Sequence, residues 1–556
     1  IKDGNVKLNI LLNFDQSGKI KKDYKIIGII SDAELGLFKY KNIKKLNFNF
    51  EITNKNYNLK ELVFKFNNVK FNSDFLNIKS KGKLFSIDGN IRNKKSKINK
   101  DIILLLYNNN YENFDFSNTQ FNSTSEFSFN IDKKLKIKKL KINSELNLDQ
   151  LILKYKLDRV KNYINDYNNL IYFKQNKFKI EYKDKNITLD GSSEFYLDNK
   201  IKNFIDFKIK KNNKKTFFES TLDLTNINIK VDDLSYYKPE NLDSILKIKG
   251  SINDNKVLFN NINYTENKNK ILINNLKLED NKILKVDNFK LNYITKNNFK
   301  NQLSLSRKNK DYKLIGKSYD SIFLIDSISN SSSNNNFFNN FKNLNSKIII
   351  KIDEVKLDKK NKINNLRGNL LINKNKITDL NITSNYSNNE KLVLSIKKNI
   401  DKSIVTNFYS DRAEPFVKKY KFIKGFENGN IIFNSSKIND TSKSRIVIDN
   451  FKVKEIPVLA KILTLASLQG IADLLTGEGI RFTDFEMTYV NKGSLMTIEE
   501  IYAIGPAISI MMEGYVEGKD LVSLRGTLVP ATTINRTISS IPLLGDLLVG
   551  KKVGEG

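Results

Sequence analysis

The sequence predicts a mostly β protein: one long, curled antiparallel sheet of repeated strand units that forms a hydrophobic groove. Three observations lead to this fold class. Apolar and polar residues alternate with period two along much of the chain, which is typical of strands with one apolar and one polar face. Alanine is nearly absent before residue 451, where Ile, Phe, Tyr, Asn and Lys dominate, and this composition disfavours helices. Proline totals only 6 in 556 residues, so few breakers interrupt the pattern.

Residues 1–350 are predicted to form a repeated β-groove region, and residues 351–450 to continue it. In the clearest alternating segments the apolar residues fall on one strand face, with Lys, Asn, Asp or Glu between them. Clusters of asparagine punctuate these segments, as expected for tight turns between antiparallel strands. The candidates for the apolar wall of the groove are Leu140, Ile142, Leu146, Leu148, Ile205, Phe207, Ile209, Ile227, Ile229 and Val231.

A looser repeat lies on top of the alternation. An apolar-x-Gly-x-apolar step is centred on Gly89, Gly250 and Gly368. Partial versions of this step surround three more glycines: Gly28, Gly191 and Gly316. Two interpretations stay open: repeated strand units that must stack on their neighbours, or glycines scattered at bulges as in any strand-rich chain.

Residues 451–556 follow different rules, because one pattern occurs there twice. A proline leads an apolar run at Pro457 and again at Pro542, and a Gly-Glu-Gly follows each run. Each run predicts a short apolar helix that packs on the end of the sheet or, alternatively, touches lipid or plugs the groove. The candidates on these helices are Val458, Leu459, Ile462, Leu463, Leu468, Leu475, Leu543, Leu544, Leu547 and Leu548.

Charge and composition weigh against several function classes. The formal net charge is +33, but only nine of the 94 basic residues are arginine and the lysines are dispersed, so we expect no nucleic-acid partner. The chain has no His and no Cys, which removes the commonest catalytic base, the thiol nucleophile and the commonest metal ligands. We therefore expect a protein that is not an enzyme, with no catalytic residues, metal or cofactor. A basic surface remains suited to anionic lipid headgroups.

From about residue 350, and most closely from Asn450 to Gly556, the chain resembles the AsmA-like C-terminal region of Gram-negative envelope proteins, the AsmA, TamB and YhdP group, in its alphaproteobacterial form. The match covers these segments, in this order: Asn450-Phe451, residues 457–460, residues 465–468, residues 470–475, residues 477–479, residues 502–506, Glu513-Gly514, Gly526 with Pro530, and residues 541–545. Residues 1–350 contribute only a compatible strand pattern. The family's N-terminal membrane helix and its final strands are not among these residues.

The resemblance implies a function and a location. Such proteins look like periplasmic bridges, anchored in the inner membrane by a segment outside residues 1–556, whose groove carries phospholipid acyl chains between the inner and outer membranes. The expected partners are thus phospholipid acyl chains and the two membranes, and protein partners stay unknown. The alternative is an envelope structural or outer-membrane assembly factor that carries no lipid.

Overall fold

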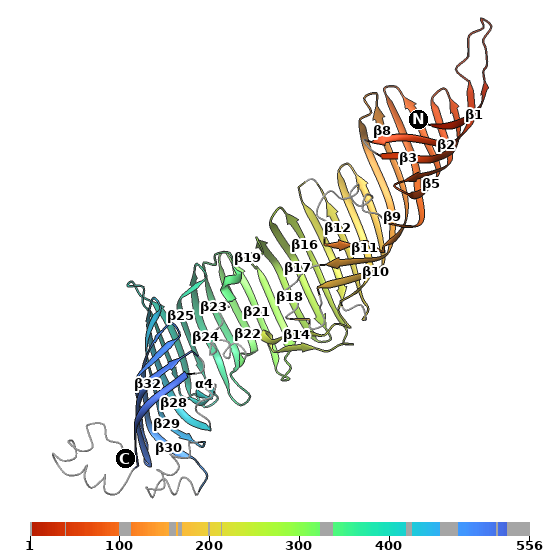
Figure 1. The fold of residues 1–556 in the computed structure, drawn as a ribbon. Coiled ribbons are helices and arrows are strands. Elements are labelled where there is room, and N and C mark those ends of the chain that lie inside the picture. Colours follow the sequence, from red (N-terminus) through yellow and green to blue (C-terminus); the bar gives the residue numbers. More distant parts are fainter. Residues whose placement is uncertain are drawn as a thin grey trace, which may run out of the picture. The chain divides into compact units, whose positions relative to one another are not determined.

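The computed structural model describes residues 3–38, 41–98, 113–154, 163–164, 169–197, 201–212, 214–322, 337–418, 425–455, 476–518 and 521–530. It is mostly β, as predicted (Figure 1). The chain divides into two compact units. Unit 1 comprises Ile1–Val231 and Tyr236–Asn281, and unit 2 comprises Asp232–Ser235 and Lys282–Gly556. The boundary at Lys282 therefore falls inside the region 1–350.

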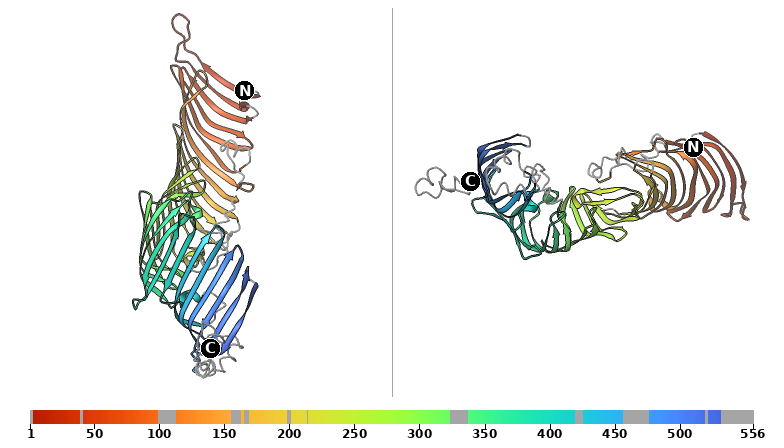
Figure 2. Two further views of the ribbon diagram at one scale, coloured as in Figure 1. Left: turned by 90° about the vertical axis from the view of Figure 1, so that its left-hand side faces the viewer. Right: turned by 90° about the horizontal axis from the view of Figure 1, so that it is seen from below.

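Unit 1 contains an open, twisted antiparallel sheet whose strands follow the chain order (Figure 2). The short strand β7 pairs with the end of β9, and β14 and β15 form a separate hairpin. The strands are β1 (Asp3–Leu11), β2 (Lys25–Phe38), β3 (Lys41–Thr53), β4 (Asn56–Phe66), β5 (Val69–Lys81), β6 (Leu84–Lys97), β7 (Phe114–Asp115), β8 (Gln120–Asp132), β9 (Ile137–Lys154), β10 (Leu170–Lys183), β11 (Asn186–Tyr196), β12 (Asn203–Lys211), β13 (Thr216–Asp223), β14 (Ile229–Val231), β15 (Tyr236–Lys238), β16 (Ser244–Asn253), β17 (Lys256–Glu266) and β18 (Asn269–Glu279).

Unit 2 also carries a sheet in chain order from β20 to β33. Its pairs are antiparallel except β22 and β23, which run parallel. A parallel pair needs a crossover rather than a tight turn, and 25 residues separate Asp320 from Ser346. The elements are the 3-10 helix η1 (Asp232–Leu234), β19 (Lys282–Lys285), β20 (Asn288–Ile294), β21 (Lys300–Lys308), β22 (Asp311–Asp320), the 3-10 helix η2 (Phe337–Asn340), β23 (Ser346–Lys356), β24 (Lys362–Asn373), β25 (Lys376–Asn385), β26 (Lys391–Lys398), β27 (Ile404–Ser410), α4 (Glu414–Val417), β28 (Phe426–Ile438), β29 (Thr441–Val453), β30 (Ile480–Lys492), β31 (Leu495–Ile504), β32 (Ile508–Glu517) and β33 (Leu521–Pro530).

Asparagine and aspartate make many of the tight turns, as the sequence predicts. Asn67 and Asn68 both have positive φ between β4 and β5, and Asp280 and Asn281 repeat this geometry after β18. Short polar side chains tolerate this left-handed backbone better than other non-glycine residues, which suits two-residue hairpins. Asn298, in the Asn297-Asn298 pair between β20 and β21, has φ of 57°.

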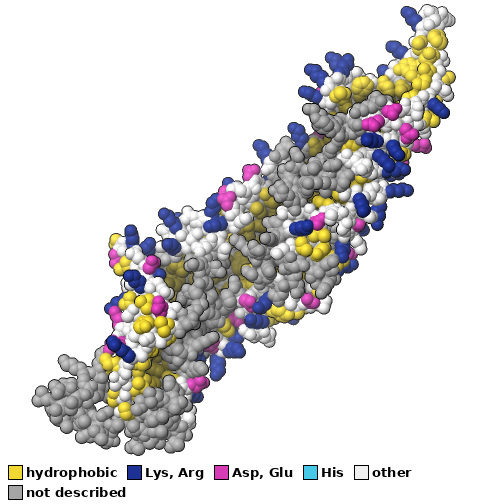
Figure 3. All heavy atoms as spheres, in the orientation of Figure 1, with side chains coloured by type: hydrophobic (Ala, Val, Ile, Leu, Met, Phe, Trp, Pro, Cys, Tyr) yellow, Lys and Arg dark blue, Asp and Glu magenta, His cyan; other side chains and the backbone are white. Residues whose placement is uncertain are grey.

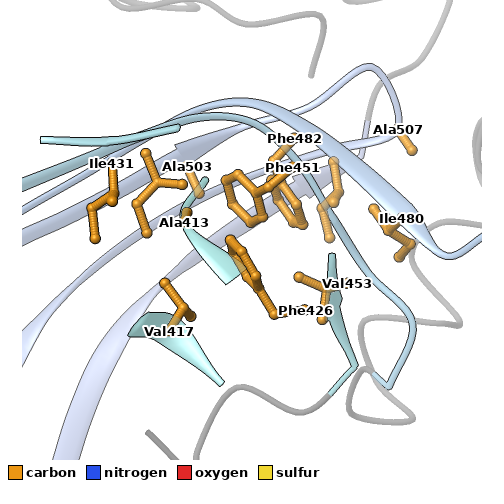
Figure 4. Close-up of a cluster of buried hydrophobic side chains, with 12 residues drawn as sticks. Ala413, Val417, Phe426, Ile431, Phe451, Val453, Ile480, Phe482, Ala503 and Ala507 are labelled. Carbon is orange, nitrogen blue, oxygen red and sulfur yellow. The ribbon is translucent and has the colours of Figure 1, made fainter. Parts of the chain in front are cut away.

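The largest buried hydrophobic cluster in the described part of unit 2 joins the short helix α4 to strands β28 to β32 (Figure 4). Three rings stack across β28, β29 and β30: Phe451 lies 5.1 Å from Phe426 and 5.2 Å from Phe482 between ring centroids. Val417, from α4, belongs to the same buried cluster, and Phe426 is fully buried. Aromatic pairs at such distances add to the free energy gained from burial alone.

The two proline-led helices predicted from the sequence fall outside the described residues, as do all ten apolar candidates assigned to them. The short helix α4 begins at Glu414 and carries Pro415 in its first turn. Within the part of the chain that the structure describes, no helix is long and apolar enough to cross a membrane.

Candidate functional site

Four of the predicted groove residues share one face of β9. Leu140, Ile142, Leu146 and Leu148 are half-buried or buried, whereas the four residues that alternate with them, at positions 141, 143, 145 and 147, are exposed. Ser144 stands in the same row as the leucines and interrupts it with a hydroxyl group that bonds the Ser125 hydroxyl at 2.8 Å. The face is therefore apolar with occasional small polar positions.

Ile205, Phe207 and Ile209 of β12 lie on this same face. The register shows the connection directly, because Leu146 pairs with Phe178, Phe178 with Gly191, and Gly191 with Phe207. Directly opposed residues in a sheet point to the same side. The structure thus brings the β9 and β12 candidates together on one surface, which we call the apolar face of unit 1.

The remaining three candidates lie elsewhere. Ile229 and Val231 belong to β14, which pairs only with β15, and Ile227 is 5% exposed beside that hairpin. The alternating pattern at these positions is real, but it marks a short hairpin and not a strand of the long sheet. Period two alone does not distinguish these cases.

The six repeat glycines explain how the apolar faces are built. Each is paired in register with a large apolar residue on a neighbouring strand. The six pairs are Gly28 with Phe50, Gly89 with Phe127, Gly191 with Phe207, Gly250 with Phe218, Gly316 with Leu303, and Gly368 with Ile382.

The apolar partner lies across the glycine, in space that a Cβ atom would occupy. A Cβ on Gly191 would lie 2.4 Å from the end of the Phe207 ring, and a Cβ on Gly28 would meet Phe50 at the same distance. In unit 1 all four partners are phenylalanines, so the rings lie low on the sheet. We call these six glycine positions glycine slots. In unit 1 they line the apolar face with the four phenylalanine rings, which we call its ring floor.

The face is open within the described part of unit 1. The described helices belong to unit 2, and only β14 and β15 form a second sheet. Several apolar residues near the ends of the strands are well exposed, among them Phe85 at 36%, Ile187 at 39% and Ile252 at 41%. Ordinary globular sheets bury such a face under a second layer, so this surface is suited to contact an apolar ligand.

One rim of this sheet carries short turns that are rich in lysine. The turn between β8 and β9 contains Lys133, Lys134 and Lys136, and the turn between β12 and β13 contains Lys214 and Lys215. The exposed apolar strand ends lie next to this rim, because Ile187 and Ile252 each stand one residue inside a strand end there. The opposite rim carries the long connections, including β7 and the β14–β15 hairpin.

A buried polar network holds the β14–β15 hairpin in place. The Tyr236 hydroxyl lies 2.8 Å from that of Tyr264 on β17 and donates to the carboxylate of Glu266. Burial raises the pKa of Tyr264 to about 12 and raises that of Tyr236 further. Both phenols are therefore neutral donors at physiological pH.

Lys238 is the most unusual residue of the hairpin, because its side chain is fully buried. Its ammonium group donates to the carbonyl oxygens of Thr225, Ile227 and Pro239 at 2.8 to 2.9 Å. Burial lowers the pKa of this lysine. Three carbonyl acceptors satisfy its three donors, so the hairpin is tied to the preceding connection.

The opposite face of unit 1 is polar and regularly charged. Six residues of alternating sign stand in register across β9, β10, β11, β12, β13 and β16. They are Glu145, Lys179, Asp190, Lys208, Glu219 and Lys249. Lys208 approaches Asp190 to 2.8 Å, and this hydrogen bond raises the pKa of Lys208. Exposed pairs stabilise little, but they keep this face in water and so fix which face is apolar.

An exposed apolar surface of this kind is suited to binding an apolar ligand. Among the described residues, no group of three Asp or Glu side chains gathers to hold a metal ion.

The sequence did not predict the ring floor or the buried Lys238. The glycine repeat was a signal for the ring floor, since each glycine has a bulky apolar partner in register.

Comparisons with protein-family models, with curated proteins and with solved structures found no match for this chain.

Proposed function

We propose that this protein binds the acyl chains of phospholipids along the apolar face of unit 1 and carries them between the inner and outer membranes. One observation carries the proposal: a continuous apolar face with a floor of phenylalanine rings is uncovered in the described part of unit 1. Acyl chains need only such a surface, because they make no hydrogen bonds.

The two faces and the rim suit different parts of a phospholipid. The acyl chains lie against Ile142, Phe207 and Ile209, whereas the charged headgroup stays near the lysine-rich turns. Cationic rims attract anionic headgroups. The row of six alternating charges on the opposite face keeps that face in water, so lipid occupies the apolar face only.

The resemblance to the AsmA-like group supports this assignment. It also indicates which two membranes the lipid would pass between. It favours a periplasmic protein that is anchored in the inner membrane and has no catalytic activity. A structural or outer-membrane assembly factor without lipid remains the alternative, and the experiment below separates the two.

Site-specific photocrosslinking tests the proposal. A photoreactive residue at Ile142 or Ile209 should capture co-purifying phospholipid, detected as a mass increase of the chain. The same residue at Lys141 or Lys208, each adjacent in sequence but on the polar face, should capture none. Equal labelling of both faces, or labelling of neither, would refute lipid carriage on this face and favour the structural alternative.

A further inference from the structure

The strand β1 and the hairpin that follows it differ from the rest of unit 1 in exposure. Every residue of β1 is exposed, including Val6 at 52%, Leu8 at 50% and Ile10 at 53%. Leu8 pairs with Gly28, and Gly28 pairs with Phe50, so these side chains lie on the apolar face. The apolar face thus continues to the first strand and is most exposed there (Figure 3).

The hairpin between β1 and β2 carries apolar residues to its tip. Phe14 and Ile20 form a bridge opposite each other, and each is 56% exposed. Leu11 at 61% and Leu12 at 41% stand just below them. Four bulky apolar side chains at one hairpin tip are costly in water unless something covers them.

Hydrogen bonds close the turn that presents these residues. The Asp15 carboxylate accepts hydrogen bonds from the backbone N–H groups of Ser17 and Lys19 and from the Ser17 hydroxyl. These bonds lower the pKa of Asp15. Gly18 supplies the positive φ, 77°, that closes the turn. A preformed turn holds Phe14 and Ile20 outward without a further cost in conformational entropy on binding.

Three lysines lie beside the apolar tip. Lys19, Lys21 and Lys22 are exposed beside Ile20, whereas one of the two nearby carboxylates, Asp15, is engaged in the turn. The other, Asp23, accepts a hydrogen bond from the Asn13 side chain. An apolar tip with exposed lysines beside it matches the layers of a membrane surface, where acyl chains lie beneath anionic headgroups.

We propose that the hairpin of residues 11–25 inserts its tip into the headgroup region of an anionic phospholipid bilayer. Phe14 and Ile20 then reach the acyl boundary, while the three lysines meet lipid phosphates. Membrane insertion itself does not depend on lipid carriage. Only its use as a loading point, from which lipid reaches β1 and the apolar face, rests on the proposed function.

The absence of tryptophan from the chain makes insertion measurable. A Phe14→Trp variant of the whole chain, mixed with phosphatidylcholine vesicles containing phosphatidylglycerol, should show a blue-shifted emission and protection from acrylamide. Vesicles of phosphatidylcholine alone should give a weaker response. The matched control is Ile400→Trp, because Ile400 is fully exposed in the lysine-containing turn between β26 and β27.

Flotation with the same vesicles gives the second measurement. Replacing both Phe14 and Ile20 by Asp should weaken binding about tenfold or more, whereas Ile400→Asp should leave it unchanged. Circular dichroism should show the same fold for all variants. Equal emission shifts in the Phe14→Trp and Ile400→Trp variants, or unchanged flotation of the double variant, would overturn the proposal.

A blue shift without vesicles that grows with protein concentration would also overturn it, because a second copy would then cover the tip. Photocrosslinking at Ile142 is independent of these readouts. Failure of the hairpin to insert and failure of the apolar face to carry lipid are therefore distinguishable.

Discussion

The apolar face of unit 1 and the core of unit 2 start from the same strand pattern but end differently. In unit 2, twelve residues, Phe451 among them, form one buried cluster, and α4 contributes Val417 to it. In the described part of unit 1, the buried cluster on the sheet comprises three residues, Val69, Phe121 and Leu148. Phe195 and Tyr264 are also buried on that face, but many of its other rings and aliphatic side chains are half-buried or exposed.

This difference shows that alternation alone does not determine whether a sheet face is core or binding surface. Unit 2 fills this part of its face with its own side chains, because aromatic rings stack across three strands and Val417 of α4 joins their cluster. Unit 1 spreads rings over glycines and leaves their upper surfaces accessible. The second arrangement lowers the free energy of unfolding, because apolar area stays in contact with water. A ligand that covers this area raises the free energy of unfolding again.

The largest expected effect contrasts one ring from each unit. Phe451→Ala should cost about 3–5 kcal/mol, because it removes a buried ring and leaves a cavity. Phe207→Ala should cost only about 1–2 kcal/mol, because its ring is half-buried. Hydrogen exchange at the amides of β29 and β12 measures both losses locally. Equal losses would mean that the two faces are equally well packed.

The buried lysine gives the next effect. Lys238→Met should cost about 2–3 kcal/mol, because the carbonyls of Thr225, Ile227 and Pro239 lose their donor. Faster hydrogen exchange should appear in β14 and β15. Lys247→Met, an exposed lysine on β16, is the control and should change nothing. Unchanged exchange in both variants would show that water replaces the ammonium group without loss.

The glycine slots sharpen the comparison between the units. A Cβ on Gly368 would lie 2.3 Å from the backbone oxygen of Asn381, whereas a Cβ on Gly191 would meet only the end of the Phe207 ring. A side chain can move and a backbone cannot, so Gly368→Ala should cost about 2–3 kcal/mol and Gly191→Ala about 1 kcal/mol. Thermal unfolding compares them. A larger loss for Gly191→Ala would mean that the ring floor is rigid.

The smallest effect is a pH dependence in unit 2. Burial and the charge of Asp484, directly opposite in register, raise the pKa of Asp449. The folded state therefore binds this proton more tightly, and stability falls as pH rises from 3.8 through the raised pKa. Asp449→Asn should add about 0.5 kcal/mol at pH 7 and nothing near pH 3.

Melting temperatures at the two pH values test this prediction. Asp440→Asn, in the exposed turn between β28 and β29, is the control. A gain of equal size at both pH values would contradict the role of charge repulsion at Asp449.

The sequence predicted the strands, their turns and the β9 and β12 residues of the apolar face, because alternation and asparagine turns are local signals. It did not distinguish β14 from the strands of the long sheet. The sequence also did not predict the burial of Lys238, because two of its three carbonyl acceptors, Thr225 and Ile227, come from a connection whose path depends on tertiary contacts. The glycine repeat was visible, but its meaning lay in the register, which brings each glycine opposite a bulky residue.

Lipid extraction with quantitative mass spectrometry, on natively purified protein, tests the central claim most directly. The parent chain should carry phospholipid, Ile209→Asp should carry less, and Lys210→Asp, one residue away on the polar face, should match the parent. A parent chain without phospholipid, or equal losses from both variants, would contradict the account.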